Sequence, residues 1–112
     1  MLKFHKGKIS GTAVVVLFPG VCKVNAAIAA QILIDTYGVD LVINAGTTDR
    51  MNPELEIFDT VISTEVAYHD VESDILIEFY PWLGSVFFKS DQELLDLTRE
   101  AIGKIDTKGK VY

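Results

Sequence analysis

The chain has 112 residues, of which 49% are hydrophobic, and its formal net charge at pH 7 is −6. This length fits one domain with a buried core, and the acidic balance, without a cluster of Lys or Arg, excludes a nucleic-acid partner. No apolar run reaches the roughly 18 residues that a membrane-spanning helix needs, and the alternating amino terminus is not typical of a signal peptide, so we expect a cytoplasmic protein with no membrane contact.

The first residues predict a β-hairpin. Apolar and polar side chains alternate over residues 2–5, which indicates a strand with one solvated face and makes His5 a solvated strand residue. Ser10-Gly11 is a turn pair that joins this strand to Thr12–Phe18. The second run is apolar without interruption, so we expect a strand that is covered on both faces.

A long apolar helix follows the hairpin. A turn at Pro19-Gly20 opens it, the pattern predicts helix over Lys23–Tyr37, and Gly38 can take the left-handed conformation that ends a helix. Apolar residues cover most of its circumference, so we expect it to be mostly buried. Leu41–Ala45 then predicts an interior strand, parallel to Thr12–Phe18, with the helix crossing between the two in the right-handed sense.

The second half of the chain is less regular. Thr60–Tyr68 is rich in β-branched residues and predicts a third strand. The segment Val71–Phe88 shows neither helical nor strand periodicity, but its aromatic residues are not typical of a disordered loop, so we expect it to pack against something, such as another subunit.

One more helix is predicted near the carboxyl terminus. Ser90, with Glu93 three residues later, forms a capping-box pattern, and Gly103 stops the helix that it begins. Lys104–Tyr112 has the composition to begin a further strand. Together the elements predict a single α/β domain over residues 1–112, three-layered, with a central mixed or parallel sheet flanked by helices.

Four stretches carry a resemblance to the 5′-methylthioadenosine/S-adenosylhomocysteine nucleosidases of the nucleoside phosphorylase superfamily. Each is similar to a family segment, and the likeness runs from about Phe4 to about Ile105, which corresponds to the middle of a family member. The stretches are Gly20–Ala27, Asp40–Gly46, Val61–Asp70 and Phe88–Asp91. The resemblance implies a truncated nucleoside phosphorylase-like fold.

The family hydrolyses the N-glycosidic bond of adenine thioribosides, which needs an acid to protonate the leaving purine and carboxylates to hold the ribose and the water. The resemblance places all three acids outside the residues of this sequence, so it implies no catalytic residue here, no cofactor and no metal ligand, and a chain that is inactive alone. It carries over a degenerate substrate-binding set for an adenine nucleoside. These residues are Val21, Gly46, Thr47 and Thr48.

The sequence departs from the family pattern where backbone freedom matters. Thr47-Thr48-Asp49-Arg50 stands for the family's Ser-Ala-Gly-Gly, Cys22 stands for the second glycine at the helix start, and Phe58-Asp59 stands for Gly-Asp. Side chains at these positions oppose positive φ and close approach of the backbone to a ribose. The departures therefore predict a weakened binding site.

For three polar features the sequence leaves two alternative roles open. Cys22, the one cysteine, agrees with a reducing compartment, and it is either a thiol activated by the helix dipole or a small buried replacement for glycine. His69-Asp70 is either a general-base pair or a structural or interface pair. Asp49-Arg50 binds a ligand carboxylate or is a solvated loop pair.

By the same resemblance, Phe79–Phe88, called here the aromatic segment, corresponds to the family region that lines the partner subunit's alkylthio pocket. It is therefore the candidate interface of a homodimer, with core packing as the alternative. We place the interface in the wider region Tyr68–Phe88, and its candidate residues are Tyr68, His69, Phe79, Tyr80 and Trp82. Three hypotheses stay open: a nucleosidase relative or fragment, a non-catalytic remnant that binds a nucleoside or a protein, and a structural subunit that is stable only as an oligomer.

Overall fold

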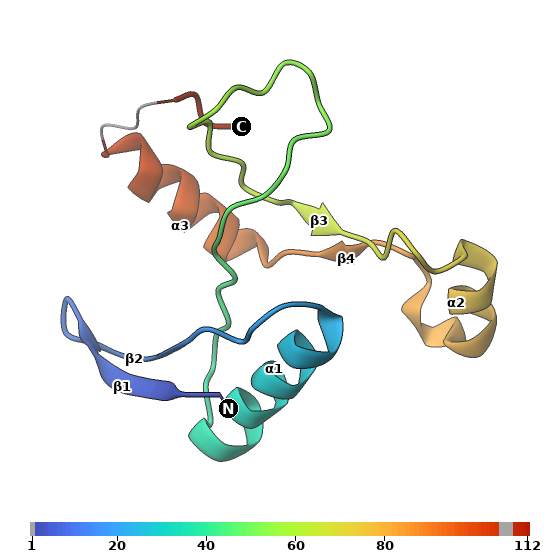
Figure 1. Cartoon of the computed structure of the whole chain (residues 1–112), viewed down its shortest axis with the longest axis horizontal. Helices are drawn as coiled ribbons and strands as arrows, with labels where there is room; N and C mark the ends of the chain where they lie inside the picture. The colour runs from blue at the N-terminus through green and yellow to red at the C-terminus, as the bar shows by residue number, and fades with distance from the viewer. Residues whose placement is uncertain (1, 106–108) are drawn as a thin grey trace. The chain divides into compact units, whose positions relative to one another are not determined.

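The computed structural model describes residues 2–105 and 109–112. The chain divides into two compact units, residues 1–48 and residues 49–112, and each is described by itself (Figure 1). The prediction of one domain over residues 1–112 stays a prediction.

The first unit begins with the predicted hairpin. Strand β1 (Phe4–Ile9) pairs antiparallel with β2 (Thr12–Leu17), in a register that sets Phe4 opposite Leu17. The two turn residues have positive φ, 48° at Ser10 and 83° at Gly11, which matches the twist that a two-residue hairpin requires. Local turn chemistry therefore fixes the pairing, and this prediction is confirmed.

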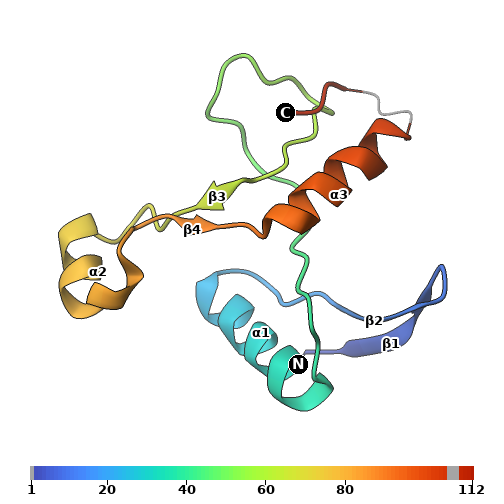
Figure 2. The ribbon, with the colours of Figure 1, turned by 180° about the vertical axis from the view of Figure 1, so that it is seen from behind.

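Helix α1 (Lys23–Tyr37) lies beside the hairpin, as the view from behind shows (Figure 2). The Tyr37 ring stacks on Phe4 with 5.2 Å between the ring centroids, and the Lys6 ammonium lies 5.2 Å from the centroid of the same ring. Gly38 ends the helix at φ 59°, and its N–H donates to the Ile34 carbonyl at 3.1 Å. The bounds and the glycine stop agree with the sequence.

Two predictions for this unit are wrong. Helix α1 is not mostly buried, since only Ala29 and Leu33 are buried and Val24 is 70% exposed. Residues 41–45 form no strand, so the predicted parallel pair of Leu41–Ala45 with Thr12–Phe18 is absent from the described residues. An apolar run encodes burial, but a strand exists only where a neighbour accepts its backbone hydrogen bonds.

The second unit contains short strands. Strand β3 (Glu65–Val66) pairs antiparallel with β4 (Phe88–Lys89), so the predicted strand Thr60–Tyr68 shrinks to two residues and an isolated bridge. That bridge joins Thr60 to Val111 in parallel. The Thr60 N–H donates to the Lys110 carbonyl and the Tyr112 N–H donates to the Thr60 carbonyl, both at 2.8 Å.

Of the predicted carboxyl-terminal strand, the described residues show only this isolated bridge at Val111, and residues 106–108 of the same prediction lie outside the described residues. The predicted central sheet flanked by helices is corrected as well. Within the described residues the sheets are two antiparallel pairs, β1 with β2 and β3 with β4, and the Thr60–Val111 bridge is the parallel element.

Residues 71–88, whose sequence shows no helical or strand periodicity and which were therefore predicted to form a loop, contain two short helices. Helix α2 (Ser73–Phe79) is followed by the 3₁₀ turn η1 (Pro81–Leu83), which ends at Gly84 with φ 62°. The prediction is wrong because α2 has only seven residues, too few for a periodic pattern to emerge. Asp74 lies in its first turn, where a carboxylate complements the helix dipole.

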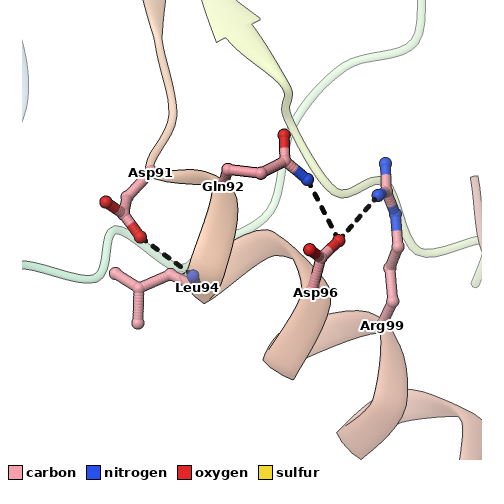
Figure 3. A network of polar contacts seen from close by, with 5 residues as sticks. All are labelled: Asp91, Gln92, Leu94, Asp96 and Arg99. Carbon is pink, nitrogen blue, oxygen red and sulfur yellow. Dashed lines mark hydrogen bonds and ion pairs between the residues drawn. The ribbon is translucent and has the colours of Figure 1, made fainter.

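Helix α3 (Gln92–Gly103) begins one residue later than predicted (Figure 3). The cap is Asp91, whose carboxylate accepts from the Leu94 N–H at 3.0 Å, and not Ser90. Ser90 belongs to the preceding strand pairing, because its N–H donates to the Thr64 carbonyl at 2.9 Å and its hydroxyl donates to the Ser63 carbonyl at 2.8 Å. The capping box is therefore wrong, although the helix is right.

The buried core of the described residues is small. It comprises Ala29, Leu33 and Leu95, while large apolar side chains such as Ile43 and Trp82 are 78% and 75% exposed. No helix among the described residues is both long and apolar enough to cross a membrane.

Candidate functional site

The loop that enters α1 is built around the carbonyl of Val21. The Asn25 amide nitrogen Nδ2 donates to this carbonyl at 2.8 Å, which ties the first helical turn to the preceding turn. Gly20 has φ 87°, and a Cβ there would lie 3.2 Å from Asn25 Nδ2. The loop thus needs glycine at position 20, while the Val21 side chain is left 74% exposed.

Cys22 is the residue before α1 and is exposed, so the prediction of a small buried residue is wrong. Its φ of 75° and ψ of 162° fall in a region that glycine occupies almost alone. No side chain caps the helix here. Cys22 thus carries a side chain on a backbone conformation that favours glycine, at the position where the family pattern has glycine.

Three of the four predicted binding residues lie in irregular backbone after helix α1. Gly46, Thr47 and Thr48 are all exposed, and they belong to the same compact unit as Val21. A Cβ at Gly46 would meet no atom within 4 Å. Their role toward a nucleoside stays a prediction.

Arg50 closes the turn that follows this loop. Its guanidinium donates to the Leu55 carbonyl and, at 3.4 Å, to the Pro53 carbonyl. Asn52 accepts from the Glu54 N–H at 2.9 Å within the same turn. The Arg50 side chain therefore serves the local backbone, a role that the pattern of residues 47–50 does not predict.

His69 and Asp70 lie in an exposed bend after β3. Beside them, the ring of Tyr68 meets the ring of Phe88 edge-on with 5.8 Å between centroids. Together with Val66 and Ala67 these rings line a small hollow of about 230 Å³. It is below the 300–1,000 Å³ of typical small-molecule pockets.

The other predicted interface residues lie at the end of α2 and in η1. The rings of Tyr80 and Trp82 are edge-on at 5.4 Å, and Phe79 and Trp82 are 69% and 75% exposed. Exposed aromatic side chains are typical of protein interfaces, but their role in one stays a prediction.

Asp59 is a residue that the sequence does not single out. Its carboxylate accepts from the Glu56 N–H and from the Lys110 N–H, each at 2.8 Å, and so joins positions 51 residues apart. The hydrogen bond from Glu56 chiefly holds the pKa of Asp59 below its usual value of 3.8, with Lys110 adding to the effect against some desolvation. Its backbone neighbour Phe58 has φ 77°, again where the family pattern has glycine.

Among residues 2–105 and 109–112, no three His, Cys, Asp or Glu side chains gather as a metal site. The described geometry thus offers a loop around Val21, an exposed stretch at residues 46–48 and an aromatic surface, without a cluster of acids.

Comparison with known proteins identifies the family. The family model of the Phosphorylase superfamily matches residues 2–111. A 5′-methylthioadenosine/S-adenosylhomocysteine nucleosidase of Bacillus subtilis is 37% identical over 107 residues, 93% of this chain and 46% of the relative. One from Staphylococcus haemolyticus is 36% identical over 98% of this chain and 49% of the relative.

A solved structure supports the same assignment. The nucleosidase of the same name from Neisseria meningitidis, in complex with methylthio-immucillin-A, is 30% identical and gives a TM-score of 0.85 over 98% of this chain and 48% of its own. The chain therefore spans about half the length of the relatives that it matches. It belongs to the Phosphorylase superfamily, as a homologue of the 5′-methylthioadenosine/S-adenosylhomocysteine nucleosidases.

Proposed function

We propose that this chain is the part of a nucleosidase fold that contacts an adenine nucleoside, and that it does not cleave the N-glycosidic bond by itself. The observation that carries the proposal is the match over 93% of the chain to a methylthioadenosine/S-adenosylhomocysteine nucleosidase. The resemblance described above implies that the family's three acids have no counterpart among these residues. The nucleoside contacts are Val21, Gly46, Thr47 and Thr48.

The chemistry explains why these residues are insufficient. Adenine is a poor leaving group as an anion, so cleavage requires an acid that protonates the purine and a carboxylate that orders water. The proposed contacts supply backbone amides, two hydroxyl groups and one apolar side chain, none of which is an acid at neutral pH. They can bind and orient a ribose but cannot protonate a base.

The binding itself is expected to be weak. Cys22 places a side chain on backbone where the family pattern has glycine, and Asp49 and Arg50 replace two further glycines beside the loop. Each change limits how closely the backbone approaches a ribose. We therefore expect methylthioadenosine to bind this partial site weakly, with a dissociation constant on the order of 1 mM or above, where the binding free energy is only about −4 kcal/mol.

Nuclear magnetic resonance titration with methylthioadenosine tests this proposal. We expect amide shifts at Val21 and at residues 46–48, and their loss in Gly46→Val. Gly7→Val is the matched control, because a Cβ at either glycine would meet no atom within 4 Å. Shifts confined to other residues, or shifts that Gly46→Val leaves unchanged, would show that the nucleoside site lies elsewhere.

A second function, self-association through the aromatic segment, is favoured by the exposure of Phe79 and Trp82. Sedimentation at micromolar concentration is expected to give a mass of two chains, reduced to one by the double substitution of Phe79→Ser and Trp82→Ser. The control is Met51→Ser, because Met51 is 95% exposed outside this segment. A mass of one chain for the unsubstituted protein would remove this function.

A further inference from the structure

Val21 lies on a short loop whose backbone is unusual on both sides of it. Gly20 before it has φ 87° and Cys22 after it has φ 75°, values that residues with a side chain rarely adopt. The helical hydrogen bonds of α1 begin with the bond from the Ala26 N–H to the Cys22 carbonyl, at 3.2 Å. The Val21 carbonyl therefore lies one residue before the helical ladder, which does not fix its orientation.

The side chain of Asn25 holds this carbonyl instead. Asn25 lies in the first turn of α1, and its amide nitrogen Nδ2 donates to the Val21 carbonyl at 2.8 Å. The same amide lies against Gly20, where an added Cβ would come within 3.2 Å of Nδ2 and 3.8 Å of Cγ. One side chain thus fixes the carbonyl of Val21 and packs on the backbone of the residue before it.

This hydrogen bond serves the loop more than the helix. A side chain that caps a helix start accepts from an N–H of the first turn, and among the described residues none caps α1 in this way. Asn25 donates to a loop carbonyl instead, and it is exposed, so the bond adds little to the stability of the fold. Its effect is to restrict the conformations of residues 20–22. A contact residue that is ordered beforehand loses less entropy when a ligand binds.

We propose that Asn25 is a positioning residue for nucleoside binding, which holds Val21 in place through the hydrogen bond to the Val21 carbonyl. The side chain of Val21 is 74% exposed, so a ligand can reach it. The inference rests on the proposed function, and it adds a residue that acts through Val21 without touching the nucleoside.

Two substitutions at position 25 separate the loop from the helix. Asn25→Ala removes the amide. Asn25→Asp keeps the size and shape of the side chain, but an ionised carboxylate has no hydrogen to donate to a carbonyl. A carboxylate in the first turn also complements the helix dipole, so Asn25→Asp should not destabilise α1 itself. Gln31→Ala is the matched control, because it removes another exposed side-chain hydrogen bond of the same helix, the bond to Asp35 at 2.7 Å.

Nuclear magnetic resonance titration of the 112-residue chain with methylthioadenosine measures the effect on binding. We expect both variants of Asn25 to raise the dissociation constant about fivefold, which is the effect of one ordinary hydrogen bond. At about 1 mM nucleoside, the ligand-induced shift of the Val21 amide should then fall by at least about threefold. Gln31→Ala should leave this shift unchanged.

Two further measurements on the same proteins separate positioning from folding. Amide order parameters at residues 20–22 should fall in both variants of Asn25, because the loop is no longer held. The melting temperature of Asn25→Asp should stay within about 2 °C of the unsubstituted value, as is usual for a surface substitution.

Three results would overturn this inference and leave the proposed function standing. Unchanged nucleoside affinity in Asn25→Asp would show that the donated hydrogen bond has no role in binding. An equal loss of affinity in Gln31→Ala would assign the effect to the helix as a whole. A fall in melting temperature of more than about 5 °C in Asn25→Asp would make Asn25 a structural residue.

Failure of the proposed function gives a different pattern. If the unsubstituted chain shows no ligand-induced shifts at Val21 or at residues 46–48, both proposals are wrong. Shifts at residues 46–48 with none at Val21 would keep a nucleoside site in the chain and would remove Val21 and Asn25 from it.

Discussion

Each of the two compact units is stabilised internally, and the kind of contact differs between them. Residues 1–48 depend on apolar packing around Ala29 and Leu33. Helix α1 has no side-chain cap, no acidic residue in its first turn and no basic residue in its last turn. Residues 49–112 depend on polar contacts: Asp91 caps α3, and the ion pair of Lys104 with Glu100 at 2.6 Å supports its last turn. The first unit thus depends on burial of apolar side chains, while helix α3 of the second unit is stabilised by polar contacts between residues near in sequence.

The contrast between α1 and α3 shows what a helical pattern conveys. The apolar residues of α1 cover most of its own circumference, a pattern that is typical of a helix in the core of a large protein. Helix α3 has one apolar stripe that buries Leu95, and an outer side where Asp96 accepts from Gln92 at 3.0 Å and from Arg99 at 3.4 Å (Figure 3). Exposed pairs of this kind add only about 0.3–0.5 kcal/mol each, so they support a surface helix but do not replace a core.

The largest expected effect is in the apolar unit. Leu33→Ala should reduce the free energy of unfolding by about 3 kcal/mol, since Leu33 is only 8% exposed and truncation leaves a cavity. Gln31→Ala on the same helix is the control, because its side chain makes only an exposed hydrogen bond to Asp35. Urea unfolding measures both, and similar losses for the two variants would contradict a unit held by burial.

Relief of backbone strain should act in the opposite direction. Cys22→Gly is expected to raise the free energy of unfolding by about 1–2 kcal/mol, because glycine adopts φ 75° and ψ 162° without a steric cost. Cys22→Ala keeps the Cβ and should give no such gain. Thermal unfolding of the three proteins decides the matter, and an equal gain for Ala and Gly would assign the effect to the thiol.

The polar unit should respond to loss of its helix cap. Asp91→Ala should cost about 1 kcal/mol, whereas Asp91→Asn keeps an oxygen that accepts from the Leu94 N–H and should cost less than half of that. Chemical denaturation followed by circular dichroism measures the difference. If Asn and Ala are equally destabilising, the charge and not the hydrogen bond is what matters.

The smallest effect concerns pH. The pKa of Asp59 is lowered in the folded chain, so its contribution is full above the ordinary value of 3.8 and is lost as pH falls through the lower folded value. Amide exchange at Lys110 should therefore speed up in that acidic range. Asp59→Asn should remove this pH dependence, and its persistence in the variant would place the titrating group elsewhere.

Sequence reasoning succeeded where the signal is local. The Ser10-Gly11 turn and the Gly38 stop are confirmed because each requires a backbone conformation that few residues adopt. It failed at residues 41–45, since a strand depends on a distant neighbour, and at Ser73–Phe79, which is too short to show a period. Of the site, the turn before α1 is predicted from Pro19-Gly20, whereas the roles of Asn25, Arg50 and Asp59 depend on contacts that no motif encodes.

Adenine release from methylthioadenosine most directly tests the proposal that these 112 residues do not cleave the N-glycosidic bond by themselves. The Bacillus subtilis relative serves as the positive control in a coupled assay. Loss of a protonating acid alone costs a factor of about 10²–10⁴, so the 112-residue chain should release adenine no faster than buffer within the sensitivity of the assay. Release at a rate near that of the relative would contradict the claim and would require residues of this chain, such as Asp49 or Asp70, to act as the acid.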